Sequence, residues 1–144
     1  MIDNKFVKIG LIILFSICVF SCNYYTERDV QKYLPGKYLY RFPSGEASVL
    51  IINSDFTFNN KIYAKDKGAL LYETEGTMKI DGRHITFNDF LLFFDHNESE
   101  MIFSKPEIGL LTNSYWEKPK NNKDVSRIEL NTYNYIFKKN RITD

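Results

Sequence analysis

The sequence predicts an all-β fold, an antiparallel meander of about eight to ten strands that forms a small closed or half-open barrel. Three observations point to it. From residue 37 onwards, apolar and polar residues mostly alternate with a period of two, as in strands with one buried face. Short polar turns separate these runs. A sheet of so many short strands hides its edges best by curling closed.

The first 22 residues differ from the rest of the chain. Lys5 and Lys8 precede a purely apolar or small-residue run over residues 9–20, and Ser21 follows. This arrangement is typical of an export signal. A transmembrane helix needs about 20 apolar residues, so the run is too short to span a bilayer. Two alternatives remain, namely a buried core helix and an ordinary signal peptide with an incidental cysteine.

The motif Val19-Phe20-Ser21-Cys22 resembles the bacterial lipobox. The resemblance implies a diacylglyceryl group on the Cys22 thiol and cleavage just before Cys22. Each buried methylene of such an anchor contributes about 0.8 kcal/mol, and two or more chains make attachment stable. Cys18 would be removed with the signal, so the mature chain would keep no free thiol and no disulfide.

The lipobox also implies a location in the bacterial cell envelope, with the membrane as a partner through the lipid on Cys22. In some Bacteroidota, surface export resembles a rule that requires acidic residues just after the cysteine. Asn23-Tyr24-Tyr25 lacks them. We therefore expect an outer-membrane protein that faces the periplasm.

Four segments follow from this interpretation: a signal peptide over 1–21, a lipidated cysteine with a tether and short helix over 22–35, a barrel over 36–139 and a tail over 140–144. The whole chain carries a formal net charge of +1. The signal holds two lysines and one aspartate, so the mature chain is formally neutral. A neutral domain is not built to hold a polyanion, which argues against nucleic-acid binding.

A short helix is expected over residues 26–34. Thr26 suits an N-cap, and Glu27 and Asp29 suit a first turn. Val30 and Leu34 would share one face with Tyr33, and Pro35-Gly36 would end the helix. A disordered stalk is the alternative.

The strands are predicted from runs bounded by turn residues. The strongest hairpin signal is Asp81-Gly82, where both residues tolerate the positive φ of a type I′ turn. The run Phe90–Phe94 is the most apolar of the mature chain, so we expect a strand covered on both faces or one face lining a pocket. The expected strands are 37–42, 47–52, 56–62, 69–72, 77–80, 85–87, 90–94, 101–103, 108–112, 126–130 and 133–138.

A second resemblance concerns the barrel. Gly36-Lys37-Tyr38 at the start of the first strand is similar to the Gly-x-Trp of lipocalins, with Tyr38 in place of tryptophan. The hairpin over residues 76–87 resembles the second glycine-led hairpin of small lipocalin-like envelope lipoproteins of Bacteroidota. The resemblance implies an apolar barrel interior and no catalytic centre. An eight-stranded interior is either filled by side chains or holds one small ligand.

The chain is rich in aromatic residues, with 12 phenylalanines, 10 tyrosines and one tryptophan. Aromatic rings with polar tips suit an amphiphilic ligand or a partner surface. A plain core with tyrosine hydroxyls at the rim is the alternative. The candidate ligand-binding residues of the interior are Tyr38, Tyr40, Phe58, Phe87, Phe94 and Trp116.

Catalytic and metal-binding signals are weak. The sequence has two histidines and no phosphate loop or nucleophile elbow. His96 could meet a metal ion together with Glu98 and Glu100, but a polar turn after an apolar strand explains these residues without a metal. His84 could form an acid/base set with Asp81 and Glu75, but such residues usually flank a hairpin. We therefore expect no enzyme, no metal and no cofactor.

Three functions remain open at this point. The first is a lipid-anchored, non-catalytic binding module for a small apolar or amphiphilic ligand. The second is a protein-interaction lipoprotein, such as an inhibitor, immunity factor or accessory subunit, which binds an envelope protein through its outer face or loops. An enzyme is the weakest of the three.

Overall fold

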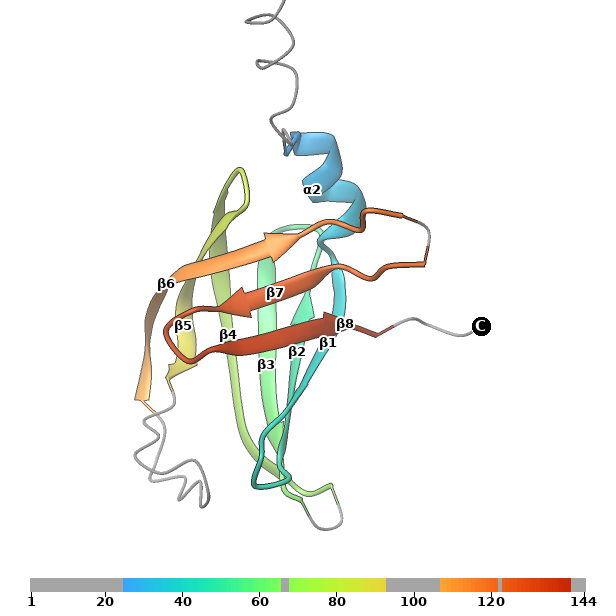
Figure 1. Cartoon of the computed structure of the whole chain (residues 1–144). Coiled ribbons are helices and arrows are strands. Elements are labelled where there is room, and N and C mark those ends of the chain that lie inside the picture. Colours follow the sequence, from blue (N-terminus) through green and yellow to red (C-terminus); the bar gives the residue numbers. More distant parts are fainter. Residues whose placement is uncertain (1–24, 66–67, 93–106, 122, 141–144) are drawn as a thin grey trace, which may run out of the picture.

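The structure is a computed structural model that describes residues 25–65, 68–92, 107–121 and 123–140. Its eight strands form one closed antiparallel barrel in which each strand pairs with the next and β8 closes onto β1. Among the described residues, one short helix, α2, lies at one end of the barrel (Figure 1). The predicted fold class is therefore confirmed.

The elements follow one another along the chain without crossovers. They are α2 (Glu27–Tyr33), β1 (Gly36–Arg41), β2 (Ala47–Ile52), β3 (Thr57–Tyr63), β4 (Leu70–Asp81), β5 (His84–Leu92), β6 (Glu107–Glu117), β7 (Arg127–Leu130) and β8 (Tyr135–Lys139).

Strand β4 corrects the expectation of two strands on either side of Gly76. It runs unbroken for 12 residues. A Cβ at position 76 would lie 2.1 Å from the carbonyl oxygen of Asn88 and 2.8 Å from the ring of Phe58. The glycine therefore marks a close approach between strands rather than a break, as glycines inside strands often do.

Strand β5 joins two runs, 85–87 and 90–94, that the sequence predicts as separate strands. The register shifts between Phe87 and Phe90, and Asp89 has a φ of 63°. This bulge reorients the strand and allows the neighbouring residues Phe90 and Leu91 both to be buried. The prediction of cover on both faces is confirmed at these two residues.

Two further strand boundaries and one turn type differ from the predictions. β6 extends to Glu117, well past residue 112. β8 begins at Tyr135, because Asn134 adopts a φ of 55° in the preceding turn. The β4–β5 loop is Gly82-Arg83, and only Gly82 has a positive φ, so the predicted type I′ turn is wrong although the hairpin is confirmed. The expected strand 101–103 lies outside the described residues.

The core fills the inside of the barrel. Its largest fully buried side chains come from every strand except β4 and from the C-cap of α2. They are Trp116, Tyr38, Phe58, Phe87, Phe90, Phe137, Leu34, Leu50, Ile62, Ile85, Ile128 and Leu130. The alternation of buried and exposed residues is clearest in β3 and β8. Inward residues of the strands thus form one continuous apolar cluster.

Candidate functional site

Helix α2 begins where its sequence predicts. The Thr26 hydroxyl accepts a hydrogen bond from the Asp29 amide at 3.1 Å, and the Asp29 carboxylate accepts one from the Thr26 amide at 3.1 Å. This capping box satisfies two amides at the helix start. Val30 and Leu34 are buried, so the apolar face of α2 lies on the barrel.

The end of α2 is held by three side chains, one from the adjacent strand β1 and two from the far end of the chain. The Tyr38 hydroxyl donates to the Leu34 carbonyl at 2.6 Å. The Ser126 hydroxyl and the Lys139 ammonium both donate to the Tyr33 carbonyl, at 3.0 Å and 2.7 Å. These bonds satisfy carbonyls that a helix end leaves unpaired. Burial raises the pKa of Tyr38 and lowers the pKa of Lys139.

The start of α2 is held from the other side by the β6–β7 loop. The Lys118 ammonium lies 2.9 Å from the Asp29 carboxylate, and both side chains are partly exposed. Lys118 also lies over the Tyr25 ring at 5.3 Å. Tyr25 meets Trp116 edge to face, with ring centroids 4.8 Å apart. Trp116 in turn donates to the Gly82 carbonyl at 3.0 Å. The helix is therefore fixed relative to the β4–β5 hairpin.

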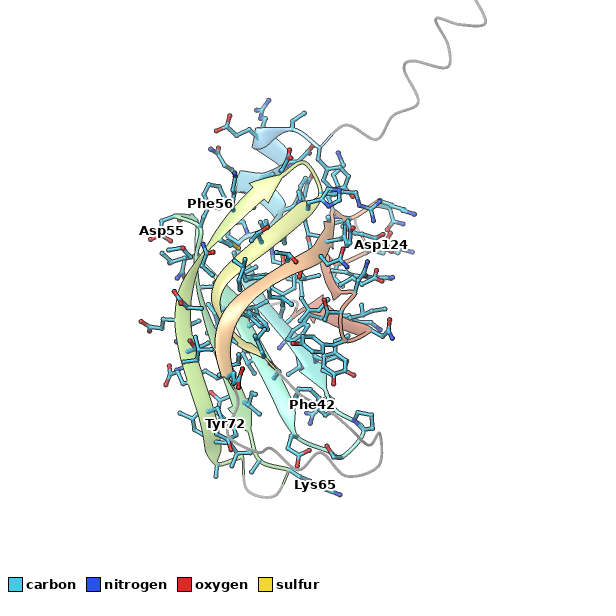
Figure 2. The ribbon with its side chains drawn as sticks, turned by 90° about the vertical axis from the view of Figure 1, so that its left-hand side faces the viewer. Phe42, Asp55, Phe56, Lys65, Tyr72 and Asp124 are labelled. Carbon is cyan, nitrogen blue, oxygen red and sulfur yellow. The ribbon has the colours of Figure 1, made fainter. Side chains whose placement is uncertain are left out.

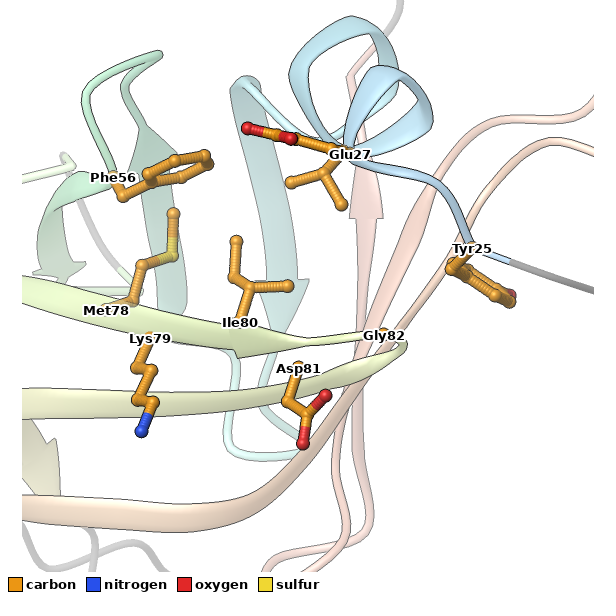
Figure 3. Close-up of a pocket in the computed structure, with 9 residues that line it drawn as sticks. Tyr25, Glu27, Phe56, Met78, Lys79, Ile80, Asp81 and Gly82 are labelled. Atoms are coloured by element: carbon orange, nitrogen blue, oxygen red, sulfur yellow. The ribbon is translucent and has the colours of Figure 1, made fainter.

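A groove of about 450 Å³ lies between α2 and β4. In Figure 3, the side chains of Met78 and Ile80 point from β4 toward α2, and the Phe56 ring lies above Met78. Lys79 and Asp81 point away on the opposite face of the strand. The lining residues are Tyr25, Glu27, Val30, Phe56, Met78, Lys79, Ile80, Asp81 and Gly82.

Phe56 has an unusual backbone. It sits in the β2–β3 turn with a φ of 62°, a region that costs a non-glycine residue about 1–3 kcal/mol. Its amide donates to Asn53, and its carbonyl accepts from the Met78 amide at 2.9 Å. These bonds hold the ring at the groove. We expected Phe56 to belong to the following strand, which is wrong. Its positive φ places it in the turn, and β3 begins one residue later, at Thr57.

The groove has the chemistry of a small binding site. Val30, Phe56, Met78 and Ile80 supply apolar surface, and their contacts with a ligand would remove that surface from water. The Glu27 carboxylate extends over the groove toward Phe56 (Figure 3). A volume of about 450 Å³ lies within the range of about 300–1,000 Å³ that small-ligand sites occupy. The arrangement suits the non-covalent binding of an apolar group.

No protein-family model, no curated protein and no solved structure matches this chain.

The predicted interior residues lie elsewhere than the groove. Tyr38, Phe58, Phe87 and Trp116 are all buried in the barrel core, with at most 1% of each side chain exposed. Tyr40 is half-buried, stacks on Tyr135 at 4.5 Å between ring centroids, and has a pKa raised by burial. That these residues bind a ligand stays a prediction. Phe94 and Cys22 lie outside the described residues.

Sequence reasoning missed the groove because three separate segments build it, namely residues 25–30, Phe56 and residues 78–82. The pairing of Met78 and Ile80 on one face was visible in the alternation of β4. The position of Phe56 was not, since nothing in the sequence indicates a positive φ at a phenylalanine. The docking of α2 over β4 depends on contacts with residues about 90 or more positions away along the chain.

The other candidate sets are only partly described. Asp81 and His84 lie opposite each other across the hairpin, whereas Glu75 accepts a hydrogen bond from Asn59 at 3.2 Å. His96, Glu98 and Glu100 lie outside the described residues. Among the side chains that the structure describes, His, Cys, Asp and Glu form no group of three or more that could hold a metal ion. Within the same ranges, no helix has the length and apolar character needed to cross a membrane.

The contact between Asp29 and Lys118 predicts a pH effect. The hydrogen bond from Lys118, followed by that from the Thr26 amide, lowers the pKa of Asp29. A lowered folded-state pKa stabilises the fold above the unfolded value of about 3.9 and loses this contribution as the pH falls. Asp29→Asn should cost about 0.5–1 kcal/mol at pH 7 and little at pH 2. Urea denaturation at both pH values measures the loss of unfolding free energy. Asp124→Asn is the control, because Asp124 is exposed. Equal losses at both pH values would contradict the predicted role of the Asp29 carboxylate.

Proposed function

We propose that this protein is a lipid-anchored binding module for a small apolar or amphiphilic molecule, and that the groove between α2 and β4 is its binding site. The observation that carries the proposal is the groove itself, a hollow of about 450 Å³ with an apolar floor beside a rigidly held helix. Small-ligand sites are typically concave, mostly apolar and largely formed before the ligand arrives.

The strained backbone of Phe56 supports the same proposal. Strain of this kind persists where the surrounding structure imposes it, and it clusters at functional sites. Here it places an aromatic ring on the groove wall, above Met78 (Figure 3). A glycine or asparagine would hold the same turn at lower cost. The ring itself is thus the feature that phenylalanine adds at this position.

Binding is tested by titrating the protein with the apolar fluorophore phenylnaphthylamine. Ile80→Asp should abolish binding, because a carboxylate on the groove floor cannot be desolvated cheaply. Phe56→Gly should weaken binding about tenfold, since losing an aromatic contact costs about 1–2 kcal/mol. The stability of Phe56→Gly should stay within about 1 kcal/mol of the parent, because the strain is relieved. Ile136→Asp is the matched control, since Ile136 lies on the outer face of β8 and is 44% exposed.

The two variants distinguish the groove from the outer face of β8. If Ile80→Asp retains binding and Ile136→Asp loses it, the ligand binds outside the groove. An absence of binding to the parent protein, with no small molecule in native mass spectra of the purified protein, would contradict the proposal.

The lipid anchor is a separate part of the proposal and rests on the lipobox-like motif that ends at Cys22. Cys22→Ser should remove the protein from membranes after a carbonate wash and abolish the incorporation of labelled palmitate. Circular dichroism of the released protein should match the parent, since the barrel and α2 contain no cysteine. A Cys22→Ser protein that stays lipid-labelled would exclude Cys22 as the attachment site.

A protein partner is the second candidate, and one observation favours it. Ile108 and Leu110 lie on the same face of β6 and are 59% and 60% exposed. Exposed aliphatic residues that sit together mark interaction surfaces more often than single ones do. If an envelope protein binds there, Leu110→Glu should prevent its recovery with the tagged protein and Ile80→Asp should not.

A further inference from the structure

Tyr25 connects the groove to the segment that carries the anchor. It lines the groove, and its ring packs on Trp116 at 4.8 Å. Cys22 precedes Tyr25 by three residues. Three fully extended residues span at most about 10–11 Å. A lipid on Cys22 therefore cannot lie far from the wall of the groove, whatever path the connecting residues take.

The two ends of the barrel differ in their distance from the proposed anchor at Cys22. Figure 2 shows Asp55 and Phe56 near the α2 end, whereas Phe42, Lys65 and Tyr72 lie near the opposite end. Strands β3 and β4 run between these ends, with seven and 12 residues. A strand rises about 3.3 Å per residue, so the opposite end lies on the order of 20 Å or more further from the anchor.

We propose that the α2 end of the barrel faces the membrane, and that the groove takes up one acyl chain of a membrane phospholipid from that bilayer. This inference rests on the proposed function, since the groove as a site and the lipid on Cys22 both belong to it. The groove is near the lower end of the volume range for small ligands, which suits a single chain better than a whole two-chain lipid.

The position of Glu27 supports a lipid tail over a free fatty acid, since the ammonium of Lys79 points away from the groove (Figure 3). Glu27 extends over the apolar floor toward Phe56 (Figure 3). A fatty-acid carboxylate brought to this position would meet a like charge, which is unfavourable. A phospholipid chain enters with its uncharged end, and its headgroup stays at the membrane surface. The apolar floor then contacts only methylene groups.

The protein carries its own reporter for this event. Trp116 is the single tryptophan of the chain, and it is fully buried. It contacts Tyr25 through the edge-to-face ring pair and Gly82 through its indole hydrogen bond, and both residues line the groove. A nitroxide on a chain within the groove would lie close enough to quench Trp116 emission.

The test uses the full lipidated protein in phosphatidylcholine vesicles, with or without phosphatidylcholine that carries a doxyl group midway along one chain. We expect the doxyl lipid to remove most of the Trp116 emission in the parent and in Ile136→Asp. Ile80→Asp should retain its emission, and Phe56→Gly serves as a second groove variant if Ile80→Asp does not fold. Quenching that is equal in parent and groove variants would overturn the inference, because it would reflect proximity to the bilayer alone.

A second arm distinguishes this inference from the proposed function. The soluble Cys22→Ser protein is mixed with dispersed doxyl-labelled methyl stearate. Quenching there, without quenching of the anchored protein by doxyl lipid, would leave the groove as a binding site and overturn the membrane as the source of its occupant. An absence of quenching in both arms would contradict both proposals.

Discussion

Replacing Trp116 by alanine is expected to lower the free energy of unfolding by about 3–5 kcal/mol, the range for deleting a large aromatic side chain from a core. Trp116 is fully buried and is the largest such side chain among the described residues. The substitution also removes the indole donor to the Gly82 carbonyl and the ring that supports Tyr25. The loss therefore affects the β4–β5 hairpin, the start of α2 and the groove wall together.

Urea denaturation followed by far-ultraviolet circular dichroism measures this loss. Tyr115→Ala is the control, because Tyr115 is the neighbouring residue on β6 and is only half-buried. Trp116→Phe should recover a large part of the stability, since it keeps an aromatic ring but no donor. A Trp116→Ala loss below about 1 kcal/mol would mean that the site collapses and that the ring does not support the hairpin.

Replacing Gly76 by alanine is expected to destabilise the barrel by about 3 kcal/mol, although it adds only one methyl group. The added Cβ would lie 2.1 Å from a backbone oxygen, Asn88 O, and 2.8 Å from the buried ring of Phe58. Neither obstacle can rotate away, so β4 and β5 must separate. Thermal denaturation measures the effect as a lower midpoint.

Gly109→Ala is the matched control for Gly76→Ala. Its Cβ would also be close to a neighbour, at 2.7 Å, but that neighbour is the end of the Leu92 side chain. A flexible side chain can change rotamer, so this variant should lose much less stability. Equal losses in the two variants would contradict the distinction between backbone and side-chain obstacles.

Local rules predicted most of this fold. The helix start at Thr26, the hairpin at Gly82 and the antiparallel barrel follow from capping, turn chemistry and alternation. The failures at Gly76 and in β5 lie where neighbouring strands meet, whereas those at Phe56 and Gly82-Arg83 concern the local backbone of turns. Gly76 is interpreted as a break unless its nearness to β5 is known. The bulge at Asp89 shifts the alternation that defines the strand.

The candidate site was less predictable than the fold. The aromatic residues singled out from composition are core residues where the structure describes them, apart from the half-buried Tyr40. The groove instead depends on how a helix sits over a strand edge, and on one positive φ at Phe56. Neither property has a pattern of its own in a single sequence. Composition can indicate that aromatic surface exists, but only the fold determines which part of it faces solvent.

The way α2 ends has a consequence for the order of folding. The hydrogen bonds from Ser126 and Lys139 to Tyr33 join residues 93 and 106 positions apart. Such contacts require closure of nearly the whole chain, so they form late and slow the overall reaction. When the chain is synthesised N-terminus first, α2 has no completed surface to dock on until β8 has been added. The groove is therefore among the last features to be assembled, and truncating the final strand would remove it even though all of its lining residues remain.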